Sequence, residues 1–244
     1  MRNIALTLEY DGAEFYGFQT QKNGRTVQSE LELALKKLFQ KKIKVTASGR
    51  TDSGVHAEAQ VVHFKTENKL AFDKILRGLN HYLPEDIGVT KIQKVPASFH
   101  AQYSAKRKTY EYRIFNSPVR SPLKRVRTFF VPYPLDLSKM KQAAQLLRGK
   151  HDFRAFEASG SRRKTAVRTI RKFDVKKIEN DILVTVEANG FLYNMVRSLV
   201  GTLIEVGRGR MGLSDLKAVL VSQNRSQIGP TAPAQGLILK QVTY

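Results

Sequence analysis

A short polar stretch, GRTDSGVHA at residues 49–57, carries three side chains that could do chemistry: Arg50, Asp52 and His56. A spacing of two residues would place Arg50 and Asp52 on the same side of a strand. Asp followed by Ser and Gly is also ordinary turn chemistry, because Asp can bond to its own backbone and Gly tolerates a positive φ. The stretch therefore predicts either a surface turn or a turn that holds a carboxylate for catalysis.

The letters Asp52-Ser53-Gly54 also match the D-[ST]-G turn of aspartic proteases. That chemistry needs two carboxylates that share a proton. The chain has no second D-[ST]-G, so a dimer would have to supply it, and we disfavour this interpretation. Phosphate-binding and dinucleotide-binding loops are excluded because the stretch lacks both glycine-rich patterns.

Two further groups outside this stretch could contribute to a site. Arg197 lies among apolar residues of a helical pattern at 193–207, and a buried guanidinium needs an anion or other hydrogen-bond acceptors. Tyr110 and Tyr112 share one strand face with Lys108, which suits stacking of a nucleobase. Each also has a plain interpretation, as a surface arginine or as tyrosines of the core.

The charge of the chain points to a polyanionic partner. Lysine and arginine number 42 against 21 acids, which gives a net charge of +21. Two clusters, at 106–127 and 162–177, each hold many cations and a single acid. Such clustering favours nucleic-acid binding over an interaction with a membrane surface or a ribosome-like assembly. The basic loop at 157–168 could be an arm that orders on RNA, or an ordinary solvated loop.

Composition excludes several other classes of site. The chain has no cysteine, and its five histidines form no close pair, so we expect neither disulfides nor a metal site. No apolar run is long enough to span a membrane. The first residues lack the apolar core of a signal peptide, which predicts a cytoplasmic protein.

Hydrophobic periodicity predicts the same order of elements in both halves of the chain. In the first half we expect, in order, a strand at 4–10, a helix at 26–40, strands at 43–48 and 59–67, a helix at 71–83 and a strand at 87–95. In the second half we expect a strand at 108–116, a helix at 136–149, strands at 168–178 and 181–190, helices at 193–207 and 214–222, and a strand at 236–244.

This order predicts an α+β fold made of two ferredoxin-like β-α-β-β-α-β halves, at 1–104 and 105–244. We expect Asp52 in the first half and Tyr110 and Arg197 in the second. The two sheets would form one broad mixed sheet with helices on one face and a basic cleft for a ligand.

Seven motifs, in order from end to end, resemble the tRNA pseudouridine synthase A family. They are YDGAEFYGFQTQ (10–21), RTVQSELELAL (25–35), GRTDSGVHA (49–57), LPEDIGV (83–89), FHAQYSAKRKTYEYRI (99–114), NGFLYNMVRSLVGTLIEVGRG (189–209) and TAPAQGLILKQVTY (231–244). The region at 117–134 is the least characteristic.

The resemblance implies isomerisation of uridine to pseudouridine at positions 38, 39 and 40 of the tRNA anticodon stem-loop. The reaction involves no net redox change, so no cofactor is expected. The family works as a homodimer with tRNA contacting both subunits. A non-catalytic RNA-binding or chaperone protein of the same fold, or a synthase with other uridine targets, would be the alternatives.

The resemblance also implies roles for individual residues. Asp52 would be the nucleophile, Arg197 would pair with it, and Tyr110 would stack on the flipped uracil and assist with the proton at C5. Other residues are expected to bind the substrate: Arg50, Leu237 as a pocket wall against Tyr110, and, less directly, Gln19 and Phe18. Cations of the basic loop would contact the tRNA backbone: Arg162, Arg163, Lys164 and Arg168.

Overall fold

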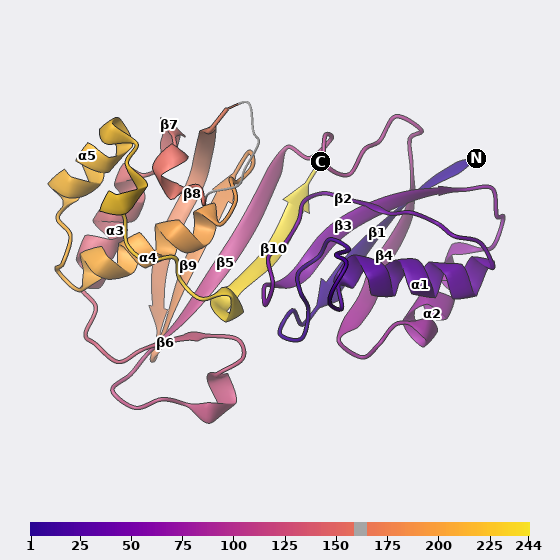
Figure 1. Cartoon of the computed structure of the whole chain (residues 1–244), viewed down its shortest axis with the longest axis horizontal. Coiled ribbons are helices and arrows are strands. Elements are labelled where there is room, and N and C mark those ends of the chain that lie inside the picture. The colour runs from indigo at the N-terminus through magenta and orange to yellow at the C-terminus, as the bar shows by residue number, and fades with distance from the viewer. Residues whose placement is uncertain (159–164) are drawn as a thin grey trace. The chain divides into compact units, whose positions relative to one another are not determined.

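The computed structural model describes residues 1–158 and 165–244 of the chain, which form two units. The first unit contains Met1–Lys106 and the C-terminal segment Ile238–Tyr244. The second unit contains Arg107–Leu237. The closing strand, drawn in yellow in Figure 1, thus belongs to the first unit from Ile238 onward, whereas the sequence prediction assigned it to a second half at 105–244.

The first unit contains a mixed sheet whose strands come from both ends of the chain. Its strands are β1 (Arg2–Tyr10), β2 (Thr46–Ala47), β3 (His56–Thr66), β4 (Ile87–Val95) and β10 (Leu237–Thr243). Strand β1 lies between β3 and β4 and is antiparallel to both, and β2 is antiparallel to β3. Strand β10 runs parallel to β3 at its first residues, where Ile238 faces His56.

Two helices, α1 (Val27–Phe39) and α2 (Phe72–Tyr82), pack together in the first unit (Figure 1). Helix α1 begins after Thr26, whose side chain accepts a hydrogen bond from the Ser29 backbone, and Ser29 Oγ accepts one from the Thr26 backbone. Apolar residues at helical spacing are buried on α1: Val27, Leu31, Ala34 and Leu35. This burial makes α1 and α2 the cover of the unit's core.

The strands of the second unit are ordered β5-β9-β8-β7. Its strands are β5 (Arg107–Asn116), β6 (Phe129–Val131), β7 (Gly149–Asp152), β8 (Val167–Ile178) and β9 (Asp181–Ala188). Neighbours in that order are antiparallel, and the short β6 runs parallel to β5. Strands β8 and β9, which the sequence predicted at 168–178 and 181–190, form a hairpin with Glu179 at φ 53° in the turn.

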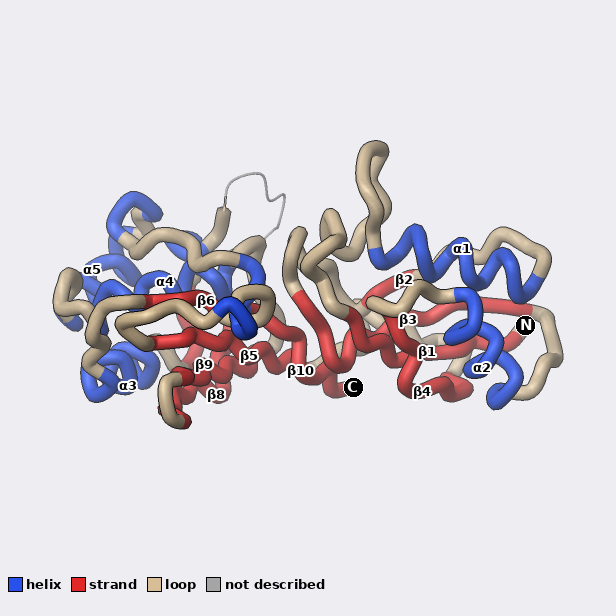
Figure 2. The backbone as a smooth tube through the Cα atoms, turned by 90° about the horizontal axis from the view of Figure 1, so that it is seen from below, coloured by secondary structure: helices blue, strands red, loops and turns tan. Residues whose placement is uncertain are grey.

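Three helices belong to the second unit: α3 (Leu137–Leu146), α4 (Met195–Gly207) and α5 (Leu213–Ser222). Helix α3 contacts α4, α5 and strand β8, and the three helices lie together beside the strands of their own unit (Figures 1 and 2). Helix α4 is buried around most of its circumference. Four short 3₁₀ segments complete the described elements: η1 (Pro122–Lys124), η2 (Arg154–Phe156), η3 (Arg225–Gln227) and η4 (Ala234–Gly236).

The predicted α+β class is confirmed, with mixed sheets and five helices in the described parts of the chain. One expected strand was wrong in extent, and two strands were missed. The strand expected at 43–48 is reduced to Thr46–Ala47, and β6 and β7 were not expected. The two ferredoxin-like halves are not confirmed and stay a prediction. The described elements of the second unit follow the order β-β-α-β-β-β-α-α instead of the expected β-α-β-β-α-β. Within the described ranges, no helix combines the length and apolarity that crossing a membrane requires.

Candidate active site

Asp52 lies in the loop at 48–55, which joins β2 to β3. Its side chain is half-buried, whereas the neighbouring Arg50 is exposed and Thr51 is buried. No strand covers these residues, so the strand spacing that we used to place Arg50 and Asp52 on one side was wrong. The Thr51 hydroxyl lies 2.8 Å from the Tyr10 hydroxyl, which anchors the loop to the end of β1.

The turn that carries Asp52 is fixed by hydrogen bonds from the segment at 15–18. Phe18 N–H donates to the Thr51 carbonyl (3.0 Å), and the Phe15 carbonyl accepts from both Gly54 N (3.3 Å) and Ser53 Oγ (3.1 Å). Val55 N–H closes the turn by donating to the Asp52 carbonyl at 3.2 Å. Since both neighbours of Asp52 are held in this way, the position of its backbone is defined before any substrate arrives.

Two glycines allow the two segments to approach so closely. A Cβ atom on Gly12 would lie 2.0 Å from the Val55 carbonyl oxygen, and one on Gly17 would lie 2.7 Å from the Thr51 carbonyl oxygen. Gly17 also has φ 84°, which other residues rarely adopt. Sequence reasoning missed both positions, although the glycines that follow Asp11 and Tyr16 in YDGAEFYG are visible in the sequence.

His56, the third polar residue of the stretch, has a structural environment. Its ring is buried at the start of β3, and Gly12 N–H donates to its Nδ1 at 3.0 Å. The same nitrogen lies 3.0 Å from Asp11 Oδ1. One ring nitrogen cannot accept from Gly12 and donate to Asp11 at once, so His56 Nδ1 bonds one of these two neighbours and links the start of β3 to residues 11–12.

The hydroxyl of Tyr10 stands next to the loop and stays protonated over a wide pH range. Burial raises the pKa of Tyr10 to about 12, although the hydrogen bonds of its hydroxyl to Thr51 and Gln60 oppose that effect. A neutral hydroxyl at this position can keep its contact with Thr51 across the range in which the protein works.

The weaker candidates beside the loop differ in exposure. Phe18 is only 2% exposed and contributes to the core, while its backbone links Thr51 to α1 through Gln28 N–H, which donates to the Phe18 carbonyl at 2.9 Å. Gln19 is exposed next to it. The structure thus places Phe18 as a support of the Asp52 loop, and of these two residues Gln19 is the one with an exposed side chain.

Tyr110 and Tyr112 lie on the same face of β5, opposite Val186 and Val184 of β9. Tyr112 is fully buried, and its hydroxyl donates to the Pro233 carbonyl at 2.7 Å. Burial raises the pKa of Tyr112, and the nearby charge of Arg197 lowers it by less. The expectation that Tyr112 shares a stacking surface was therefore wrong.

Tyr110 has a different environment from Tyr112. Its ring is 8% exposed and packs edge-on against Phe191, with ring centroids 5.2 Å apart and an angle of 87° between the planes. That contact fixes the orientation of the ring. Leu237, the expected pocket wall, is buried at the start of β10, and its packing against Tyr110 stays a prediction.

Arg197 lies on α4, and its half-buried guanidinium donates hydrogen bonds to a backbone carbonyl and to a side-chain amide oxygen. Its Nε donates to the Ala232 carbonyl at 2.7 Å and its Nη1 to Asn194 Oδ1 at 2.9 Å. Ala232 N–H in turn donates to the Arg197 carbonyl at 3.1 Å. Helix α4 approaches this segment closely at Gly201, where a Cβ atom would lie 1.7 Å from the Pro230 carbonyl oxygen.

The hydroxyl of Tyr112 also donates its hydrogen bond to this segment, 230–233. Arg197 and Tyr112 therefore hold the chain immediately before Leu237, and this support was not expected from the sequence.

Of the four cations that the sequence analysis expected to contact the RNA backbone, Arg168 is described. Its Nη1 donates to the carbonyls of Thr165 (3.0 Å) and Val167 (2.6 Å). Arg162, Arg163 and Lys164 lie outside the described residues. Within residues 1–158 and 165–244, no group of three metal-ligating side chains could hold an ion.

Comparison with known proteins identifies the family. A family model described as tRNA pseudouridine synthase matches residues 7–104 and 143–244. The tRNA pseudouridine synthase A of Thermoanaerobacter sp. (strain X514) is 45% identical over 244 residues and covers all of both chains. The chain belongs to the tRNA pseudouridine synthase A family. It is accordingly an isomerase, a tRNA pseudouridine synthase.

Other relatives of this synthase agree. The tRNA pseudouridine synthase A of Ruminiclostridium cellulolyticum is 46% identical over 245 residues and also covers both chains completely. Asp52 and Arg197 fall within the ranges that the family model matches, and Tyr110 falls between them. A solved structure titled as a Cbf5-Nop10-Gar1 complex is 13% identical, with a TM-score of 0.37, over 82% of this chain and 54% of that chain.

Proposed function

We propose that this synthase converts uridine to pseudouridine at positions 38, 39 and 40 of the tRNA anticodon stem-loop, with Asp52 as nucleophile after base flipping. The observation that carries the proposal is the Asp52 turn, whose flanking residues are bonded to the segment at 15–18. Such a turn presents a carboxylate in a fixed place, as nucleophilic catalysis requires. The resemblance of the seven sequence motifs to the family supports positions 38, 39 and 40 of tRNA as the targets.

The reaction moves one glycosidic bond without gain or loss of atoms. The N1–C1′ bond breaks, the uracil turns while it is held, and a C5–C1′ bond forms. The hydrogen at C5 leaves, and N1 gains one. Asp52 would attack the ribose or the base, or assist elimination of the uracil, and each route needs its carboxylate.

Tyr110 would stack on the uracil and act on the proton at C5. The ring is oriented by Phe191, which suits a stacking surface. We expect Tyr110→Phe to bind tRNA within about twofold of the wild type and to lose turnover by about 10²-fold, because the ring stays and a group that handles a proton is removed. Equilibrium binding and single-turnover rates measure the two effects, and an unchanged rate would remove the hydroxyl from the mechanism.

Arg197 would pair with Asp52 and keep it charged and oriented. We expect Arg197→Ala to lower turnover by at least about 10²-fold. It should also lower the free energy of unfolding by roughly 2 kcal/mol, because the Ala232 carbonyl loses a charged donor.

Arg208→Ala is the control for Arg197→Ala, because it removes a charge at the end of the same helix, where Arg208 pairs with Glu205 at 3.0 Å. Chemical denaturation and rate measurements follow both variants. If Arg197→Ala is stable and fully active, the proposed pair with Asp52 does not exist.

The target uridines lie in or beside a stem, so the enzyme must extrude a nucleotide at a cost of a few kcal/mol. Contacts to the RNA backbone would offset this cost and read the shape of the arm rather than its sequence. We assign those contacts to Arg162, Arg163, Lys164 and Arg168, and contacts around the flipped nucleotide to Arg50, Leu237 and Gln19, with Phe18 supporting the Asp52 loop from the core. The protein would act in the cytoplasm as a homodimer whose two subunits both contact the tRNA.

We also propose that each unit derives from a ferredoxin-like β-α-β-β-α-β arrangement and that the sheets join into one broad sheet. The first unit supports this, because β1, α1, β2, β3, α2 and β4 follow that order and pair as β4-β1-β3-β2. In the second unit, β6 and β7 would be additions to the arrangement.

Release of tritium from tRNA labelled at C5 of uridine tests the proposed activity, because the C5 hydrogen leaves when C5 becomes bonded to the ribose. We expect the purified protein alone, without added cofactor, to release one label for each uridine converted. Binding of tRNA with no release of label would favour the alternative, a non-catalytic RNA-binding protein.

A further inference from the structure

A third basic cluster lies in the first unit, away from the two clusters that the sequence analysis used. Five lysines occur at 36–44 without an acid: Lys36, Lys37, Lys41, Lys42 and Lys44. The first two lie in the last turn of α1, where cations stabilise the helix end. The other three follow the helix, which the chain leaves at Gln40 with φ 53°. Of these three, Lys44 pairs with Glu32 of α1 at 3.0 Å.

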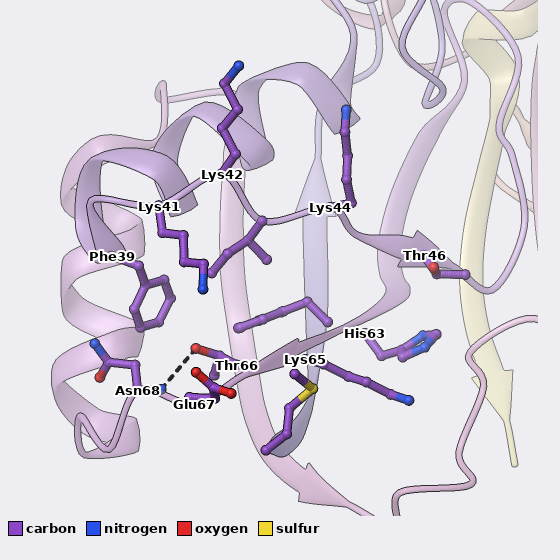
Figure 3. Close-up of a pocket in the computed structure, with 13 residues that line it drawn as sticks. Phe39, Lys41, Lys42, Lys44, Thr46, His63, Lys65, Thr66, Glu67 and Asn68 are labelled. Carbon is purple, nitrogen blue, oxygen red and sulfur yellow. Dashed lines mark hydrogen bonds between the residues drawn. The ribbon is translucent and has the colours of Figure 1, made fainter.

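A cavity of about 770 Å³ opens beside this cluster, between the end of α1 and the last residues of β3. Figure 3 shows Phe39 and Lys41 directed toward it, with Lys42 and Lys44 extending outward beside them. Four lysines line the cavity, and one of them, Lys44, is paired with Glu32 at 3.0 Å. This leaves Lys41, Lys42 and Lys65 against Glu67, the acid among the described lining residues. The cavity is therefore positive as a whole.

Apolar side chains complete the lining. Phe39 is half-buried and Phe64 is buried, and their ring centroids lie 6.1 Å apart at an angle of 55°. Ile43 also lines the cavity. An aromatic ring beside several cations is the combination that binds unpaired nucleotides, because a base can stack on the ring while its phosphate meets the lysines. The volume lies in the range of sites for ligands of nucleotide size.

The site described above lies at the other end of the same strand. The Asp52 loop enters β3 at His56, whereas Thr66, which ends β3, lines the cavity. Ten residues of extended chain separate them by roughly 30 Å. An RNA nucleotide bound in the cavity would therefore lie well away from the uridine at Asp52.

We propose that this cavity binds an unpaired, phosphate-bearing nucleotide of the RNA substrate at a point remote from the target uridine. The base would lie against Phe39, and the phosphate would contact Lys41 and Lys42. The inference rests on the proposed function, because it takes tRNA as the bound RNA. It implies that full-length tRNA makes a contact that the isolated anticodon arm lacks.

The test compares binding of full-length unmodified tRNA and of its isolated anticodon arm over a range of salt concentrations. In Lys41→Gln/Lys42→Gln, we expect full-length tRNA to bind about tenfold more weakly and the salt slope to fall by roughly 0.7, as for the loss of one phosphate contact on an unpaired strand. Binding and conversion of the isolated arm should not change. Phe39→Leu, which keeps an apolar side chain but loses the stacking face, should weaken full-length binding by at least about fivefold.

The matched control is Lys91→Gln/Lys94→Gln, which removes two exposed lysines from β4 of the same unit. An equal loss of binding in the control, or an equal loss for the isolated arm, would overturn the proposal, since either result means a general effect of charge. Unchanged binding of full-length tRNA would overturn it too. If the lysine variants weaken tRNA binding as expected but the wild type forms no pseudouridine, the cavity proposal stands and the proposed function fails.

Discussion

Replacing Asp52 by Asn should abolish turnover, by at least about 10⁴-fold, and leave tRNA binding within about twofold of the wild type. Asn has nearly the same shape as Asp but lacks the charged nucleophile, and removal of a group that acts in bond formation costs about this much in other enzymes. The turn itself should persist, because Val55 N–H donates to the backbone carbonyl of Asp52 and not to its side chain. Single-turnover rates and equilibrium binding measure the two effects.

Ser53→Ala is the control for Asp52→Asn. It removes the hydrogen bond from Ser53 Oγ to the Phe15 carbonyl in the same turn, but it touches no group with a proposed chemical role. We expect its turnover to stay within about fivefold of the wild type, because one partly exposed hydrogen bond contributes only about 1 kcal/mol. If both variants lose turnover equally, the loss comes from the turn as a structure and Asp52 is not the nucleophile.

The second large effect is expected for Gly12→Ala. The added methyl group would lie 2.0 Å from the carbonyl oxygen of Val55, a backbone atom that cannot move without moving the Asp52 turn. We expect the free energy of unfolding to fall by about 2–3 kcal/mol, as for other overpacked sites. Turnover of the folded protein should fall by about 10²-fold, because a displacement of about 1 Å at a reacting group has that effect.

Gly88→Ala provides the matched control for Gly12→Ala. A Cβ atom at Gly88, in β4 of the same unit, would meet only Asn80 Oδ1, at 4.0 Å. Chemical denaturation and turnover should both resemble the wild type. If Gly12→Ala is as stable and as active as Gly88→Ala, the close approach of the two segments does not position the Asp52 turn.

Local signals in the sequence were sufficient to predict most of the helices and strands. Thr26 at the start of an apolar helical pattern predicted the start of α1, and the residues at 179–180 between two alternating runs predicted the hairpin of β8 and β9. Both features depend on residues close together in the chain, which a sequence displays directly.

The elements that were missed depend on contacts between distant residues. The strand expected at 43–48 is short partly because Val45 N–H donates to the side chain of Glu32, at 3.2 Å, instead of to a strand. Gly149, the last residue of the helix expected at 136–149, has φ 103° and turns the chain into β7, where it pairs with Ile170. The pairing of β10 with β3 joins residues far apart in sequence, and its alternating pattern does not specify a partner.

In the candidate site, too, local features could be predicted from the sequence, whereas contacts between distant residues could not. The motif identified the Asp52 turn as polar and glycine-rich, but its hydrogen bonds to Phe15 and Phe18 appear only in the structure. Tyr110 and Tyr112 look equivalent in the sequence. They differ because the segment at 233–236 covers Tyr112, where a Cβ atom on Gly236 would lie 2.6 Å from its ring.

The central claim is that this protein converts uridines 38, 39 and 40 of tRNA by means of Asp52. The most direct test maps pseudouridine by carbodiimide-dependent primer extension on unmodified tRNA after incubation with the wild type or with Asp52→Asn. We predict modification at those positions by the wild type and none by the variant, although the variant still binds the tRNA. Modification by Asp52→Asn at the wild-type rate, or a wild type that leaves all three positions unmodified, would contradict the account.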